Sequence, residues 1–449
     1  METEDAAGVG AAPEIMERLV AYMDDMASGL GRVEQRRAAG LYARGLIEQG
    51  ARKSLEPVVA RLGGGSAEYE ALQHFLADSP WDPGVIERAV AERVCAVIDP
   101  EAWVLDDTGV VKDGKHSPGV KRQYSGTLGK TGNCQVTVSL HAVGENGTVP
   151  LGFRLYLPEE WCEDLPRRRK AKIPDSVAFQ TKPAIGGELA VRAAGWGLAR
   201  RPVLGDQAYG DDSKLRARLD EEGLEYVLSV SPTTTVFAAG TRFEPPPRKP
   251  GRGRPPARLK GDRDHIQIKT LVSELPASAW KSVTYRDRDG KPIRSHFAFV
   301  RVIAARPVAD GLTPREEWLI VERPRGHEQP SDYWLANLPA DTQHAARSLG
   351  AITMDDRARL PPAQRRAGVG PLRRPQLPRL SPPLRAGDRR ARVPDPGAAE
   401  PKSPAAGLTL PQAVLLFQPL MRCWTGRCST CQQTIDLADL PLRKLPQRE

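Results

Sequence analysis

Two short apolar segments, each ending in aspartate, most constrain how this chain can fold. Residues 103–105 lead into Asp106 and Asp107, and residues 202–205 lead into Asp206. An apolar run of this length with polar neighbours is typical of a buried strand. The pattern therefore predicts two buried strands that each deliver a carboxylate to an exposed end. A plain polar turn after each strand explains the same pattern, because aspartate is frequent at turns and helix caps.

Length and composition set the broad class of protein. A chain of 449 residues suffices for two or three domains. It has no apolar run of 18 residues, and its first residues lack the basic-then-apolar order of a signal peptide, so we expect a cytoplasmic protein without a membrane span. The six cysteines are scattered and form no disulfide framework.

The positive charge points to a polyanionic partner, although one segment supplies most of it. The net charge is +9, and a basic protein often binds nucleic acid. Residues 351–400 hold eleven arginines against five acidic residues, and thus six of the nine net charges. That segment also holds nine prolines and no aromatic residue, which predicts disorder.

The order of secondary structure follows from the apolar periodicity. Residues 14–98 show helical spacing, with helices expected at 39–49, at 67–76 and from Pro83 to Cys95. This module either binds DNA or packs on the next domain. The following segment predicts the order β-β-β-α-β-α-β, with strands and helices at 103–107, 134–143, 151–157, within 176–196, 202–206, 212–222 and 226–230.

The second half begins with a basic linker, residues 241–263. Its Arg252 and Arg254 stand in a Gly-Arg-Gly-Arg-Pro core that suits the narrow minor groove of DNA, although a solvated linker is the simpler explanation. Strand patterns return at 266–272, 283–286, 295–304 and 318–322 and end at 333–338. Near the C-terminus, Cys423, Cys428 and Cys431 offer three of the four ligands of a zinc site, so we favour free thiols there.

These motifs resemble bacterial insertion-sequence transposases of the 701 type, in the DDE superfamily. The resemblance covers residues 14–340 and, more loosely, 406–421. The blocks that carry it are residues 50–57, 72–82, 106–109, 115–117, 122–124, 129–130, 133–135 and 204–210.

The resemblance implies an α/β fold, namely a ribonuclease-H-like core with a β-rich insertion before the last catalytic helix. Such enzymes cut DNA at transposon ends and join the freed 3′-hydroxyl to a target, using two Mg²⁺ or Mn²⁺ ions held by three carboxylates. We assign the first carboxylate to Asp106, with Asp107 a close second, and the second to Asp206. The expected partner is double-stranded DNA, and a homo-oligomer in the DNA complex stays open. Expected DNA contacts are Lys115, Arg122, Lys130, Arg252 and Arg254, each with solvated surface as the alternative.

We expect six regions along the chain. An N-terminal helical domain (1–98) precedes the catalytic core (99–240), the basic linker (241–264) and the β-rich insertion (265–344). The Arg/Pro-rich segment (345–405) and the C-terminal tail (406–449) follow.

The resemblance breaks where the third carboxylate is expected. The family carries it in a motif like Arg-Trp-x-Ile-Glu, but this chain has no glutamate between Glu328 and Glu400. Read one base forward, the codons of residues 354–358 must begin with tryptophan and permit Thr-Ile-Glu after it. Our hypothesis is a pair of compensating frameshifts that replaced the catalytic helix. The chain is then a transposase by descent, impaired as written or reduced to DNA binding; a different ribonuclease-H-like hydrolase is a weaker alternative.

Overall fold

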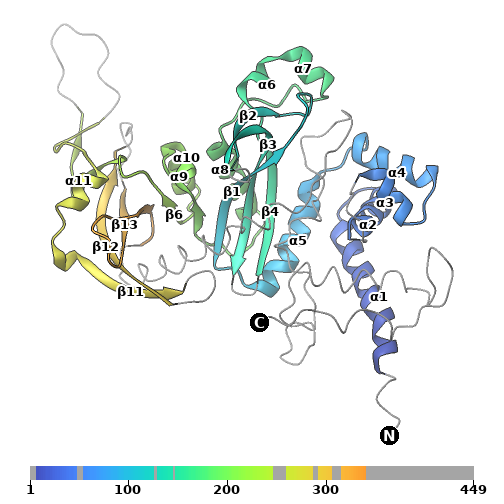
Figure 1. Cartoon of the computed structure of the whole chain (residues 1–449), viewed down its shortest axis with the longest axis horizontal. Helices are drawn as coiled ribbons and strands as arrows, with labels where there is room; N and C mark the ends of the chain where they lie inside the picture. The colour runs from blue at the N-terminus through green and yellow to red at the C-terminus, as the bar shows by residue number, and fades with distance from the viewer. Residues whose placement is uncertain are drawn as a thin grey trace.

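The computed structural model describes residues 7–47, 54–125, 129–144, 147–245, 259–286, 292–305 and 315–339. Along this part of the chain, helices come first and a large mixed sheet follows (Figure 1). None of the described helices is long and apolar enough to cross a membrane. The zinc-ligand candidates and the Arg/Pro-rich segment lie outside the described residues.

The N-terminal part is helical, as predicted. Its helices are α1 (Ala7–Ala27), α2 (Val33–Ile47), α3 (Leu55–Arg61), α4 (Ser66–Ala77) and α5 (Pro83–Ile98). The start of α5 at Pro83 is confirmed: Asp82 caps it through Gly84 N at 2.9 Å. The short α3 was not predicted. These helices share a small core that includes Leu72, Phe75 and Ile86.

The centre of the molecule is a mixed sheet with the predicted α/β character. Its strands are β1 (Ala102–Val111), β2 (Lys121–Ser125), β3 (Lys130–Gly144), β4 (Gly147–Leu155), β5 (Val203–Gly205) and β6 (Tyr226–Ser229). β3 pairs antiparallel with β1, β2 and β4, whereas β5 runs parallel to both β1 and β6. The core order is β4-β3-β1-β5-β6, so the three strands expected first along the chain lie side by side and antiparallel.

Three details of these strands differ from the sequence expectation. β1 continues past the aspartates to Val111, because its second half pairs with β3 as far as Cys134. β4 begins at Gly147 and not at residue 151, and Pro150 lies inside it, opposite a bulge at Leu140 and His141. β2 was not predicted at all, since its sequence is polar and mostly exposed.

The β-rich second unit extends the same sheet. It contains β7 (Thr235–Ala238), β10 (Ile266–Gln267), β11 (Trp280–Arg286), β12 (Pro292–Ala304), β13 (Glu316–Pro324) and β14 (Asp332–Ala336). β14 pairs with β6, so the insertion continues the core sheet. The strand predicted at 266–272 was wrong, because helix α11 (Ile268–Ser273) occupies most of it.

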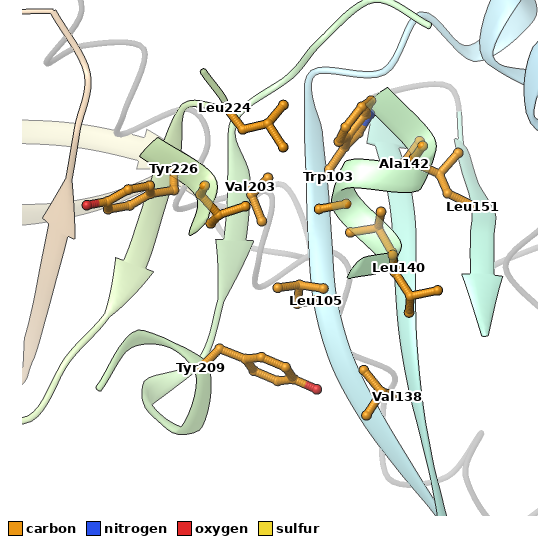
Figure 2. Close-up of a cluster of buried hydrophobic side chains, with 14 of the residues drawn as sticks. Trp103, Leu105, Val138, Leu140, Ala142, Leu151, Val203, Tyr209, Leu224 and Tyr226 are labelled. Atoms are coloured by element: carbon orange, nitrogen blue, oxygen red, sulfur yellow. The ribbon is translucent and has the colours of Figure 1, made fainter. Parts of the chain in front are cut away.

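One face of the sheet carries the helices. Residues of α5, α8 (Lys182–Ala194) and α10 (Ser213–Glu221) pack with inward residues of β1, β3, β5 and β6. Figure 2 shows this cluster, with Trp103 and Leu105 of β1 pointing into it. Leu228 of β6 pairs with Leu335 of β14, and directly paired side chains lie on the same face of a sheet. Leu335 belongs to the second apolar core, which packs under α11, so both cores lie on the same face of the sheet. Ala102 and Val104 point to the opposite face.

The remaining elements connect these parts. They are α6 (Glu159–Glu163), α7 (Leu165–Lys170), α9 (Gln207–Gly210), η1 (Ala277–Ala279) and the small β8–β9 pair (Phe243–Glu244 with Lys260–Gly261). α6 and α7 enclose a separate apolar cluster around Trp161.

Candidate active site

The parallel pairing of β1 and β5 places Asp106 beside Asp206. Trp103 pairs with Val203 and Val104 with Leu204, so each aspartate lies two residues beyond a paired position. The backbone of Asp206 is still extended, with φ −73° and ψ −177°. Neighbouring strands lie about 5 Å apart, and side chains alternate between the faces, so the two carboxylates share one face and one sheet edge.

Asp107 lies on the other face, where it forms an ion pair. Its Oδ2 is 2.6 Å from Lys182 Nζ, at the first turn of α8, and both side chains are less than one-third exposed. Lys182 Nζ also lies 5.8 Å from the centre of the Tyr156 ring. Asp106 differs: its Oδ1 accepts a hydrogen bond from the Asp107 backbone N–H at 2.8 Å. Asp107 is therefore held by a cation, and Asp106 is the aspartate on the face of Asp206.

Tyr209 joins the three carboxylates into one electrostatic cluster. Its side chain is buried, and Figure 2 shows the ring reaching from the turn after β5 toward β1, with the hydroxyl directed at the strands. Burial raises its pKa well above the ordinary value, and the charges of Asp107, Asp106 and Asp206 raise the pKa further. The hydroxyl has no hydrogen-bond partner among the described residues.

Close backbone packing fixes the turn that carries Asp206. Asp206 caps α9 by accepting a hydrogen bond from Ala208 N at 2.9 Å. At the other end of α9, a Cβ on Gly210 would lie 1.8 Å from the Ser229 carbonyl oxygen of β6. Only glycine allows this approach, and it holds α9 against the sheet.

The donor set fits a divalent cation in part. Asp106 is half-buried and Asp206 is exposed at the sheet edge, and carboxylate oxygens are the ligands that hard cations prefer. Within the described residues, however, no group of three His, Cys, Asp or Glu side chains could hold a metal ion. A cation held by these two carboxylates would complete its coordination with other oxygen ligands, such as water or a phosphate.

The predicted basic contacts lie apart from this site. Lys115, Arg122 and Lys130 are exposed, beyond the end toward which β1 runs. Arg122 pairs with Asn133, six residues along β3 from Ser139, the partner of Asp106. At about 3.4 Å per residue this is roughly 20 Å. Arg252 and Arg254 lie outside the described residues.

Sequence reasoning missed Lys182 and the role of Tyr209. Lys182 stands 75 residues from Asp107, and only the packing of α8 on β1 brings them together. Its sequence signal is a plain lysine beside a proline at a helix start. Tyr209 was part of a recognised motif, but nothing in the sequence indicates that its hydroxyl is buried beside carboxylates.

Comparison with known proteins assigns the class. The family model described as DDE superfamily endonuclease matches residues 25–292, and the chain belongs to this family. Its large mixed sheet, with helices packed against it, is consistent with the ribonuclease-H-like core of that superfamily.

A curated relative gives a narrower likeness. The chain is 33% identical over 189 residues to the probable transposase for insertion sequence element IS701 from Microchaete diplosiphon. The match covers 41% of this chain and 46% of that protein, so the chain spans about half the length of the relative it matches.

Proposed function

We propose that this chain is an insertion-sequence transposase that cleaves and joins DNA strands at transposon ends with divalent metal ions. The observation that carries the proposal is the matched register of Asp106 and Asp206 on adjacent parallel strands. The endonuclease family and the likeness to a probable transposase support it. Mg²⁺ or Mn²⁺ is the ion that suits oxygen ligands at this site.

The residues of the site have separate tasks in this proposal. Asp106 and Asp206 hold the metal. Bound metal ions would activate the attacking water or hydroxyl and stabilise the leaving oxygen. Lys182 neutralises Asp107 and thereby limits the repulsion that a third nearby carboxylate adds. Tyr209 fills the space behind the carboxylates and excludes water from that side.

Cleavage of end-containing DNA tests the proposal. We expect the purified full chain to cut such DNA only with Mg²⁺ or Mn²⁺, and Asp106→Asn and Asp206→Asn each to lower the rate at least a hundredfold. Glu101→Gln is the matched control, because Glu101 is exposed just before β1 at the opposite end of the strand. Cleavage that survives Asp206→Asn would reject the assignment.

A remnant that binds transposon ends without cutting them is the second candidate. The absence of glutamate from 329 to 399, and of a three-ligand group among the described residues, favours it. End-specific binding without cleavage would support the remnant. Cleavage of RNA–DNA hybrids or branched DNA, independent of any end sequence, would support the other hydrolase. The coding DNA tests the frameshift: a shifted frame that lacks a Trp-x-Ile-Glu helix rejects it.

The remaining assignments also belong to this proposal. The partner is double-stranded DNA, with backbone contacts at Lys115, Arg122 and Lys130 on the exposed β2–β3 end and at Arg252 and Arg254. We keep the six regions as functional divisions and place the protein in the cytoplasm, where bacterial DNA lies. A homo-oligomer in the DNA complex belongs to the same proposal.

A further inference from the structure

A polar pocket of about 360 Å³ opens where the core meets the insertion. It lies next to α9 and α10 and the segment that leads from β6 into β7, a junction visible in Figure 1. Its lining residues are separate from the proposed metal ligands Asp106 and Asp206. The polar residues that line the pocket are Asp211, Ser213, Arg216, Ser231, Thr233, Thr234 and Thr235.

Arg216 gives the pocket a buried positive charge. The residue is only 3% exposed, and its guanidinium donates one hydrogen bond, from Nη1 to the Gly210 carbonyl. Its Nε is buried without a hydrogen-bond partner, and the guanidinium forms no ion pair with any described residue. A buried charge without a counter-charge is costly, so this arrangement suits an anion that supplies one.

Hydroxyl groups surround this charge as further donors. Ser213 and Thr235 make no side-chain hydrogen bond within the described residues, so both hydroxyls can donate to a ligand. The pocket also contains one carboxylate, Asp211, which is already committed. Its Oδ1 accepts from Ser231 N at 2.8 Å and from Thr234 Oγ1 at 3.0 Å.

The other oxygen of Asp211 accepts from Gln207 Nε2 at 3.1 Å. With both oxygens occupied, the Asp211 carboxylate ties α9 to the loop after β6. The donors that remain, a guanidinium and two hydroxyls, are those that recognise phosphate oxygens.

We propose that this pocket binds a backbone phosphate of the DNA strand whose neighbouring phosphodiester lies at Asp106 and Asp206. This inference rests on the proposed function. Asp206 caps the start of α9 and Asp211 its end, so about 8 Å separates them at a rise of 1.5 Å per residue. Adjacent phosphates of one strand lie farther apart than the axial rise of about 3.4 Å per nucleotide, because the strand winds around the axis, so this span is of the order of one nucleotide step. The pocket fixes the strand on the same sheet edge as the carboxylates.

Binding of modified DNA tests the pocket. In a series of end-containing duplexes, one backbone phosphate at a time is replaced by a neutral methylphosphonate. The affinity of each duplex for the full chain is measured by fluorescence anisotropy with Ca²⁺. In the wild type, modification of the phosphate next to the cleaved bond should weaken binding about tenfold, as expected for a charge-assisted contact. In Ser213→Ala/Thr235→Val the same modification should change affinity less than threefold, because the contact is already weakened.

Thr148→Val is the matched control. Thr148 pairs with Val143 at the end of the sheet opposite the aspartates, so this variant should keep the wild-type modification profile. An identical profile in wild type and double variant would overturn the proposal. Arg216→Gln should weaken the binding of unmodified DNA at least as much as the double variant does. If Arg216→Gln does not fold, the hydroxyl variants still test the proposal.

Binding of inorganic phosphate tests the pocket independently of the proposed transposase function. At constant ionic strength, phosphate should raise the Tm of the wild type above that in chloride, and the double variant should lose this difference. Loss of all DNA binding by the wild type would overturn the proposed function and the DNA occupant. A phosphate effect that is equal in wild type and double variant would overturn the phosphate site itself.

Discussion

Asp106 and Asp107 are adjacent in sequence but lie on opposite faces of β1, so their carboxylates have different neighbours and different roles. The sequence leaves open which of them is the ligand, because both fit the end of a short apolar run. The structure supplies two observations that sequence cannot contain: the register of β1 on β5 and the ion pair of Asp107 with Lys182. Both depend on residues 75 or more positions away, so they require tertiary structure.

The Asp107–Lys182 pair should couple in stability measurements. Each side chain is less than one-third exposed, so the interaction should contribute about 1 kcal/mol, between a surface pair and a buried one. We expect Asp107→Asn and Lys182→Gln singly to cost about 1 kcal/mol each, and the double variant to cost less than their sum. Urea unfolding of the four proteins measures this; strict additivity would show that the pair contributes nothing.

The buried hydroxyl of Tyr209 should cost stability. A polar group buried without a partner is unfavourable, so Tyr209→Phe should raise the free energy of unfolding by about 1 kcal/mol at neutral pH without metal. Tyr124→Phe is the control, because Tyr124 is 64% exposed and should show no change. Destabilisation by Tyr209→Phe would mean that the hydroxyl has a favourable partner.

The raised pKa of Tyr209 also predicts that the folded state loses stability at alkaline pH. Its pKa is raised in the folded state, so the folded protein keeps this proton after the unfolded chain has lost it. The contribution of Tyr209 is fully present below the ordinary tyrosine pKa and declines as the pH rises above it. Wild type should therefore lose more stability than Tyr209→Phe between pH 9 and pH 11. Equal losses in denaturant unfolding at the two pH values would contradict the shift.

At the scale of elements, apolar periodicity predicted secondary structure wherever it agrees with the packing of the core. It predicted the long helices, β1, β3, β12 and the turn to Asp206, and the apolar residues that form the pattern pack in the core. The segment Ile266–Val272 failed because its β-branched residues suit a strand, yet Ile268 and Val272, at i and i+4, bury one helical face against β7 and β12. Such a tertiary preference overrides local propensity.

The approach of α9 to β6 predicts a severe effect of one methyl group. Gly210→Ala places a Cβ 1.8 Å from the Ser229 carbonyl, and rigid backbone on both sides cannot yield cheaply. We expect a loss of about 3 kcal/mol, at the upper end for overpacking, and a displaced Asp206. Gly31→Ala is the control, since nothing lies within 4 Å of its added Cβ. Thermal or urea unfolding compares them; equal stabilities would show that α9 moves freely.

At the scale of the whole molecule, the insertion and the core form one sheet. The change in sequence character after residue 240 predicts a second β-rich unit, and its strands are present. Sequence could not show that β14 returns to pair with β6, because pairing between distant strands leaves no local pattern. A structural change in β14, at the end of the insertion, therefore acts directly on β6, the neighbour of the strand that leads to Asp206.

Asn337 is the residue that should reveal this coupling. It follows β14, and its Oδ1 accepts from Tyr226 N at 2.7 Å, while its Nδ2 donates to Asp220 Oδ1 at 2.8 Å and Leu224 O at 3.0 Å. Asn337→Leu removes these bonds and leaves buried groups of the core unpaired, which should cost about 3 kcal/mol. Hydrogen exchange should speed up in β6 as well as in β14, while α2 and α4 keep wild-type protection. Faster exchange confined to β14 would show that insertion and core unfold independently.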